Sequence, residues 1–200
     1  MIRGRTRGLG TLMKAAVKLG RGHQFDEQHA MQVTGLALSL FDQLTGIHKL
    51  SGENKKLLLA ASVLHDIGAG ISAKGHHKHS FSLILASDLP GLSKNEKLVA
   101  ANIARYHRKN EPRKWHAMYS RLTLEDKDTV QKLSAILRIA DGLDRSHLQR
   151  VQSLTVSIKK KAMTMNVHAD GDITAETWAL RKKTAMFEKV YGLPLNIVEV

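Results

Sequence analysis

Histidine and aspartate side chains of the kind that bind divalent metal ions recur along this chain. The pair His65-Asp66 follows an apolar stretch from Lys56 to Leu64, and Gly68 stops that stretch two residues later. An imidazole and a carboxylate that meet at a helix end suit a divalent ion of the Zn, Mn or Fe type. Such a pair could instead only cap the end of a helix, so a metal site requires further ligands elsewhere in the chain.

Two other positions complete a set of four candidate ligands, His29 and Asp141, each beside the apolar face of an expected helix. Helical bundles build metal sites from inward-facing side chains of neighbouring helices. His79 and His107 are placed alike, at the start and the end of their expected helices. Four ligands would hold one metal ion. Six, with Asp66 as a bridge, would hold two ions about 3.5–4 Å apart.

Each candidate also has a simpler explanation. His29 could be an exposed helical histidine, and Asp141 could pair with Arg138 or Arg145. In a one-metal site, the extra histidines His79 and His107 could bind only substrate phosphate. We expect His76 and His77 to be solvated loop residues, and both tryptophans, Trp115 and Trp178, to be packing residues. The remaining histidines are expected at the surface: His23, His48, His116, His147 and His168.

The elements that would position these residues are mostly helices, because apolar residues recur at steps of three and four. Beyond Arg150 the apolar residues alternate instead, which predicts two strands joined at Lys159–Lys161. The sequence predicts a mainly α fold: a helical domain followed by a small α+β appendage with a β-hairpin, a helix and a short strand. The expected helices are Leu9–Leu19, Asp26–Leu44, Lys56–Leu64, a helix to about Ser87, Ser93–His107, Lys127–His147 and Thr174–Tyr191, with a last strand at Leu195–Val200.

Composition narrows the class of protein. The chain has 200 residues, a hydrophobic share of 42% and no cysteine, so any metal ligands must be His, Asp or Glu. The absence of cysteine also favours a cytoplasmic protein. No apolar run is long enough to cross a membrane. The net charge of +13 favours phosphorylated or otherwise polyanionic partners, although it could serve solubility alone.

In their order and spacing, these residues resemble the HD-domain superfamily of metal-dependent phosphohydrolases. More closely, the chain resembles the C-terminal half of the exopolyphosphatase/guanosine pentaphosphatase (Ppx/GppA) family over roughly residues 20–200. The matching blocks are Phe25–Ala30, Leu36–Asp42, Leu64–Gly68, His77–Ser80, Arg105–Arg108 and Leu137–Arg145. The resemblance implies an HD-type helical metal-binding domain over residues 23–149. The change of period places a C-terminal subdomain over 150–200, and the charge distribution places a basic segment over 1–22.

The resemblance also implies which residues carry the site. His29, His65, Asp66 and Asp141 match the superfamily's metal positions, and His79 and His107 match the extra histidines of its two-metal members. The expected cofactor is one or two divalent ions: Mn, Fe, Zn, Mg or Ni. His65 and Asp66 would be catalytic. The residues expected to bind substrate phosphate are Arg108, Arg145, Lys74 and Lys78.

Members of the family carry their phosphatase site in an N-terminal actin-like domain, which the 22 residues before the HD pattern are too few to contain. The sequence therefore predicts a stand-alone HD-domain phosphohydrolase that cleaves a phosphate ester or phosphoanhydride of a nucleotide or polyphosphate. The alternative is a non-catalytic module that binds polyanions or regulates. A homodimer would fit either function. We expect no membrane partner. Nucleic-acid binding through the basic N-terminus is a third hypothesis, which the lack of a reading motif disfavours.

Overall fold

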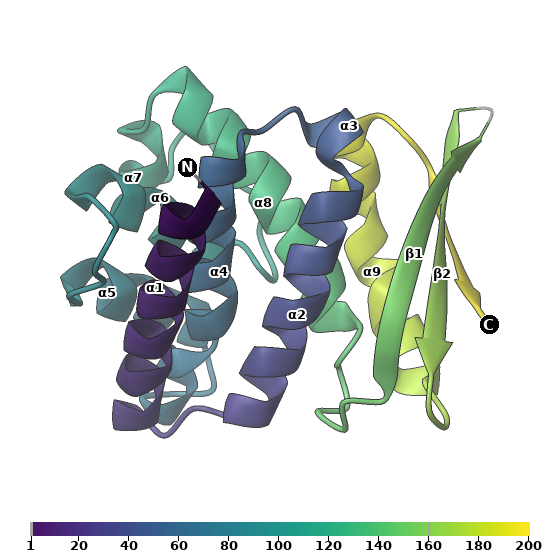
Figure 1. The fold of residues 1–200 in the computed structure, drawn as a ribbon, viewed down its shortest axis with the longest axis horizontal. Coiled ribbons are helices and arrows are strands. Elements are labelled where there is room, and N and C mark those ends of the chain that lie inside the picture. Colours follow the sequence, from purple (N-terminus) through teal and green to yellow (C-terminus); the bar gives the residue numbers. More distant parts are fainter. Residues whose placement is uncertain (1, 160) are drawn as a thin grey trace.

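The computed structural model describes residues 2–159 and 161–200, with side chains described from residue 8 onward. It is mainly helical, with a small three-stranded sheet at its C-terminal end, which confirms the predicted fold class (Figure 1). The main helices are α1 Ile2–Gly22, α2 Glu27–Gln43, α4 Lys55–Leu64, α5 His76–Ala86, α6 Lys94–Arg105, α8 Leu124–Gly142 and α9 Thr174–Tyr191. Short turns of helix are α3 Thr45–His48, η1 Gly52–Asn54, η2 Ile67–Gly70 and α7 Ala117–Ser120.

Side-chain caps fix where the helices begin. Asp26 precedes α2 and accepts a hydrogen bond from the His29 backbone N–H at 3.0 Å. Ser93 and Glu96 form a capping box at the start of α6. Thr123 caps α8 through the Asp126 N–H. Each cap satisfies backbone donors that the first turn of a helix leaves free. The predicted starts of α2 and α6 lie within one residue of the observed ones, whereas α8 begins at Leu124 and not at the predicted Lys127.

Helix α4 lies at the centre of the hydrophobic core, and every residue from Leu57 to Leu64 is buried. It packs against α1, α2 and α6. Helix α1 buries Leu12 and Ala16 in the same core and is longer than the predicted Leu9–Leu19. The basic N-terminal segment is therefore part of the packed bundle. The side chains of Arg3, Arg5 and Arg7 lie outside the described residues.

The sheet is formed by β1 (Val151–Lys159), β2 (Ala162–Ala169) and β3 (Leu195–Glu199), in that order. β1 and β2 form the predicted antiparallel hairpin, and β3 runs parallel to β2. One face of β2 is buried through Met163, Met165 and Val167. The hairpin turn includes Lys160, which lies outside the described residues.

Helix α2 is joined to the first strand by a side chain. The Gln43 amide donates to the Leu154 carbonyl at 3.0 Å, and its oxygen accepts from the Val156 N–H at 2.7 Å. Gln32 bonds the Val151 carbonyl near the other end of β1. The core residues form one cluster through both the helices and the sheet, and the predicted domain boundary near residue 150 stays a prediction.

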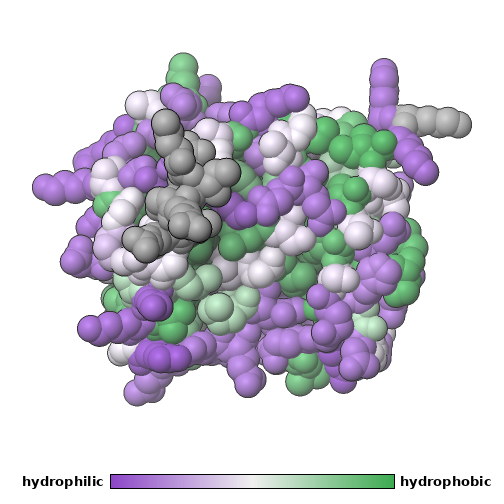
Figure 2. Space-filling view, in the orientation of Figure 1, coloured by the Kyte–Doolittle hydropathy of each residue, from purple (hydrophilic) through white to green (hydrophobic). Residues whose placement is uncertain are grey.

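Helix α8 ends at Gly142 and not at the predicted His147, because the chain beyond it adopts a non-helical path. His147 and Gln149 have φ values of 60° and 52°, a left-handed conformation that a helix does not allow. The face in Figure 2 is mostly hydrophilic, with hydrophobic residues in small separate groups. Within the described residues, no helix is both long enough and apolar enough to cross a membrane.

Candidate metal centre

The end of α4 allows two adjacent side chains to reach one point. His65 retains helical backbone angles, whereas Asp66 has φ −111° and ψ 5° and leaves the helix. Successive residues in a helix point about 100° apart, so this departure is what turns the carboxylate towards the imidazole side. The His65 Nε2 atom lies 3.7 Å from the Asp66 Oδ2 atom.

A first group of ligand atoms surrounds the Nε2 atom of His65. The His29 Nε2 atom, carried in by α2, lies 3.2 Å from it. The Asp141 Oδ1 atom, from α8, lies 3.8 Å from His65 Nε2 and 3.6 Å from His29 Nε2. His29 and His65 are buried, and Asp66 is partly exposed. Three separate helices therefore bring the four predicted ligands together.

A second group of ligand atoms shares Asp66. Its Oδ1 atom lies 3.0 Å from His76 Nε2 and 3.3 Å from His107 Nε2. His76 begins α5, and His107 follows the end of α6. The two imidazole rings are nearly parallel, with 5.5 Å between their centroids. Asp66 thus belongs to both groups and is placed as a bridge between them.

Backbone carbonyls fix the orientation and tautomer of two of these rings. The Nδ1 atom of His65 lies 2.7 Å from the Ser62 carbonyl, and that of His107 lies 2.6 Å from the Ala104 carbonyl. A carbonyl oxygen only accepts, so each Nδ1 carries the proton and each Nε2 presents a lone pair to the centre. This is how metal-binding histidines are usually held from behind.

Carboxylates beyond the cluster support His29. Its Nδ1 atom donates to the buried Asp144 Oδ2 at 2.8 Å, and Asp144 Oδ1 accepts from the Gln149 N–H at 2.8 Å. His147 stacks on the His29 ring at 3.7 Å and bonds the N-cap Asp26. The left-handed residues His147 and Gln149 therefore lie where the chain turns to hold His29.

The buried charges shift one another's pKa values. Burial by itself would lower the pKa of His29, but hydrogen bonds to Asp141 and Asp144 raise it to about 9. Burial would raise the pKa of Asp66 and of Asp141, yet the histidines facing both, and Lys183 beside Asp141, lower it well below its usual range. Burial lowers the pKa of His107 to about 3, so that ring is neutral near pH 7.

A cavity of about 340 Å³ opens onto Asp66, His107 and Asp141. Most of its other lining residues are basic. They come from the loop after α6, from α8 and the loop after it, and from α9: Arg108, Lys109, Arg138, Arg145, Lys182 and Lys183. Cations arranged around a cluster of His and Asp suit an anionic ligand with several oxygens, such as a phosphate.

Near the start of α5, the histidine in the cluster is His76 and not the predicted ligand His79. His76, predicted to be a solvated loop residue, is 6% exposed and lies in the cluster. His79 is half-buried and lies outside both ligand groups, with its Cβ close to Gly68. His77 and His48, also expected in solvent, are both buried. Helix α5 begins at His76 itself, directly after Gly75, so His76 and His77 belong to the helix and not to the loop in which they were predicted.

The predicted phosphate-binding residues divide into two pairs. Arg108 and Arg145 line the cavity, and Arg108 also lies 3.1 Å from His76 Nε2. Lys74 and Lys78 are exposed and do not line it. The prediction that the tryptophans pack inside is wrong, because Trp115 is 75% exposed and Trp178 is 57% exposed.

Two residues that the sequence did not single out contact the centre. Asp144 lies three residues after Asp141, about one helical turn later, and contacts His29. A second acid at this spacing is the sequence pattern that could have indicated it. Lys183 lies on α9 and forms an ion pair with Asp141, whereas the alternative considered from the sequence was a pairing with Arg138 or Arg145. Arg138 instead donates to the carbonyls of Tyr106, Lys109 and Asn110. No local pattern in the sequence predicts the contact between Lys183 and Asp141.

Comparison with known proteins gives one family and several relatives. The family model described as "Ppx/GppA phosphatase, domain III" matches residues 13–183. Two relatives from Aliivibrio fischeri, strains ES114 and MJ11, are each 30% identical over 146 residues, which is 72% of this chain and 28% of theirs. One from Vibrio vulnificus is 34% identical over 87 residues, 43% of this chain and 18% of its own. All three are named guanosine-5'-triphosphate,3'-diphosphate pyrophosphatase.

Proposed function

The chain belongs to the Ppx/GppA phosphatase family, as a match to its domain III, and on that premise we propose that it is a metal-dependent phosphohydrolase of the HD type. The proposed substrate is a phosphate ester or phosphoanhydride, such as a nucleotide or polyphosphate. The chain spans 28% of the length of the Aliivibrio relatives, so their activity on a guanosine polyphosphate is carried over only within this proposal.

One observation carries the proposal: a buried carboxylate oxygen and a ring-nitrogen lone pair face each other at the centre. The Asp66 Oδ1 atom is buried and forms no hydrogen bond of good geometry among the described residues, although the His76 Nε2 atom lies 3.0 Å away. Facing it is the Nε2 lone pair of His107, 3.3 Å away, whose ring is held by the Ala104 carbonyl. A buried carboxylate oxygen and a ring nitrogen lone pair repel unless a cation lies between them, so these residues fit a divalent ion.

The residues that would hold the metal are His29, His65, Asp66 and Asp141 in the first group, and Asp66, His76 and His107 in the second. A bound divalent ion supplies positive charge that activates water near neutral pH and stabilises charge on phosphoryl oxygens. Asp66 faces both groups and would accept a hydrogen bond from the attacking water and so orient it. Arg108 and Arg145 would hold the phosphate oxygens, since guanidinium groups match them in geometry.

A second candidate function is a module that binds polyanions without hydrolysing them. The basic lining of the 340 Å³ cavity and the partial coverage of the relatives favour it. In this case the same Arg and Lys side chains would bind phosphate, and no bond would break. The two functions differ in whether turnover depends on Asp66.

Metal analysis of protein purified without chelator is the first test. We expect bound Mn, Fe, Zn or a similar ion, and metal-dependent hydrolysis of a generic phosphate ester. Asp66→Ala and His65→Ala should abolish both. The matched control is His168→Ala, because His168 is an exposed histidine on β2 outside the cluster.

Two results would contradict the hydrolase. Protein that retains no metal after incubation with these ions would remove its proposed cofactor. Hydrolysis that survives in both the Asp66 and His65 variants would place the chemistry elsewhere. Metal binding and phosphate binding without turnover would favour the second candidate function.

A further inference from the structure

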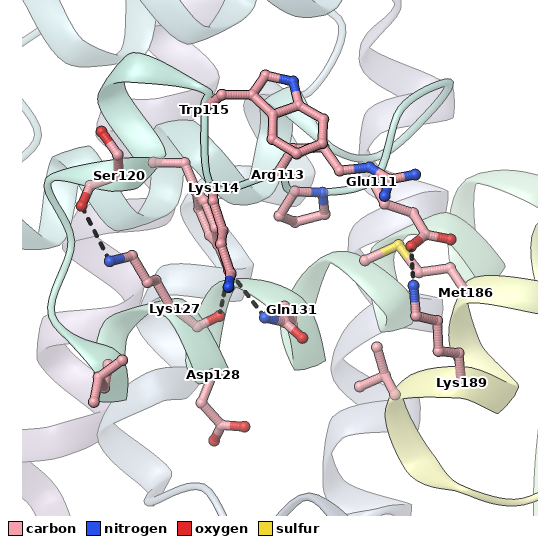
Figure 3. A pocket seen from close by; sticks show the side chains of 14 residues that line it. Glu111, Arg113, Lys114, Trp115, Ser120, Lys127, Asp128, Gln131, Met186 and Lys189 are labelled. Atoms are coloured by element: carbon pink, nitrogen blue, oxygen red, sulfur yellow. Dashed lines mark hydrogen bonds and ion pairs between the residues drawn. The ribbon is translucent and has the colours of Figure 1, made fainter.

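A second cavity, of about 960 Å³, lies beside the first one and is lined by the segment 111–115, by α7 and α8, and by α9. Figure 3 shows the Trp115 indole on one side of it, with Lys127 of α8 and Lys189 of α9 across from the ring. Trp115 is 75% exposed, although a ring of this size normally loses most of its exposed surface on folding. The ring is therefore available to a ligand.

The charge of this cavity is positive. Its two acids are already paired, Glu111 with Lys189 at 2.7 Å and Asp128 with Lys132 at 2.6 Å. Arg113 and Lys114 stand next to Trp115 in the chain, and the Arg113 guanidinium lies 5.8 Å from the indole centroid. An exposed ring with adjacent cations is the arrangement that proteins use to stack a nucleic acid base near its phosphates.

The two cavities lie along the same pair of antiparallel helices. Gln131 of α8 lines the second cavity and Arg138 lines the first; on α9, Lys189 lines the second and Lys182 the first. Gln131 and Arg138 are seven residues apart on α8, and so are Lys182 and Lys189 on α9. Seven residues span about 10 Å along a helix axis. Arg138 also holds the carbonyls of the loop that runs from the metal cluster to Trp115.

We infer that the second cavity binds the nucleoside part of a phosphorylated substrate, with its base on Trp115 and its phosphates extending towards Arg108 and Asp66. The inference rests on the proposed function and assigns a place to the nucleoside of its substrate. Inorganic polyphosphate has no ring to cover the indole, and a cavity of this volume is of the size that encloses a small organic ligand.

The chain provides its own reporters, because each cavity is lined by one of its two tryptophans. In Trp178→Phe protein, only Trp115 fluoresces. In Trp115→Phe protein, only Trp178 does. The probes are GTP and inorganic tripolyphosphate, titrated with chelator so that neither is hydrolysed. We expect GTP to change Trp115 fluorescence and tripolyphosphate to leave it unchanged, whereas both should change that of Trp178.

Affinity measured by calorimetry gives an independent result. Trp115→Ala should weaken GTP binding roughly 10-fold, the usual effect of removing one stacking ring, and leave tripolyphosphate binding unchanged. Trp115→Phe should retain most of the affinity because it retains a ring. Leu148→Ala is the matched control, since Leu148 is 57% exposed outside both cavities.

Equal responses of Trp115 to the two probes, or none to either, would overturn the inference. So would a Trp115→Ala protein that binds GTP as tightly as the wild type. Failure of the proposed function is seen separately, as absence of bound metal and of hydrolysis in the unaltered protein. A Trp115 response to GTP in such a protein would still place a nucleoside in the second cavity.

Discussion

Asp144 illustrates how much of the candidate centre depends on residues that would not touch a metal. Its side chain is 1% exposed and accepts hydrogen bonds from His29 and from the Gln149 backbone. Together these contacts leave one orientation for the His29 ring, with Nε2 towards His65. Carboxylates that support a ligand histidine in this way also make the ring a better donor to a metal.

Replacement of Asp144 should therefore weaken metal binding. Asp144→Asn retains the shape of the side chain but removes its charge. Its amide group would also place a donor opposite a donor of Gln149, either the backbone N–H or the side-chain amide. We expect metal affinity to fall about 10- to 100-fold, measured by competition with a chromophoric chelator. Asp42→Asn is the control, because Asp42 pairs with Lys55 at the surface. Unchanged affinity in Asp144→Asn would show that His29 does not depend on this carboxylate.

His48 is buried far from the centre and is held as a neutral ring. Its Nε2 donates to the Phe41 carbonyl at 2.8 Å, and its Nδ1 accepts from the Leu50 N–H at 2.9 Å. Burial is the main cause that lowers its pKa below the ordinary value of 6.5, and protonation would also break the bond from Leu50. His48 thus fits the fold only without its proton.

The stability should therefore depend on pH through His48. A lowered folded pKa means that its contribution is present above pH 6.5 and is lost as the pH falls towards the folded pKa. Between pH 7.5 and 5.5 we expect wild type to lose more unfolding free energy than His48→Gln, measured by urea unfolding at each pH. Parallel loss in both proteins would assign the acid sensitivity to other groups.

The sequence predicted His29, His65, Asp66 and Asp141 as neighbours, and the structure brings them together, because helical periodicity shows which side of a helix faces the core. Periodicity does not distinguish His76 from His79, which lie three residues apart on the same side of α5. The path of the loop before α5 decides between them, and a glycine-rich loop has no periodic signal. Lys183 is 42 residues from Asp141, so its contact depends on how α9 packs against α8.

At the scale of elements, Gly68 lets η2 pack closely against α5. A Cβ at this position would lie within van der Waals radii of the His76 carbonyl, the Ser80 N–H and His79. The Gly68 N–H also donates to the Ser80 hydroxyl at 3.0 Å. Because the obstacles are backbone atoms at the start of α5, a side chain here must move the helix that carries His76.

Gly68→Ala should therefore separate α5 from the centre. We expect a loss of about 1–3 kcal/mol in unfolding free energy, the usual cost of overpacking, together with weaker metal binding. Gly35→Ala is the matched control. A Cβ there has nothing within 4 Å, so the change in α2 should be neutral or stabilising. Equal stability of the two variants would show that α5 adapts without cost.

At the scale of the whole molecule, α9 connects the C-terminal sheet to the candidate centre. It packs on α8, and its Lys183 pairs with Asp141 where the two helices meet. Both side chains are mostly buried, 17% and 13% exposed. Removing one partner of such a pair leaves the other charge without compensation, which costs more than the pair itself contributes.

We expect Lys183→Met to destabilise the metal-free protein by about 2 kcal/mol, less than a fully buried pair would lose, because some water reaches Asp141. Added divalent metal should restore most of this stability by neutralising the same carboxylate. Thermal unfolding with and without metal measures both effects. The control is Lys189→Met. Lys189 lies on α9, as Lys183 does, but its ion pair with Glu111 is more exposed. Destabilisation that metal does not reduce would place Asp141 outside the ligand set.

The contacts of Gln43 and Gln32 with β1 also bear on self-association. Open strand edges recruit strands from other chains, and proteins commonly protect them. Because glutamine side chains of α2 occupy backbone groups of β1, an incoming strand would first have to displace the helix that carries His29. In the sheet order β1-β2-β3, β3 is the other edge strand, and there the Glu188 side chain of α9 bonds the Leu195 N–H at the start of the strand. Aggregation by strand addition should therefore begin at β3, leaving the metal-binding end of the molecule folded.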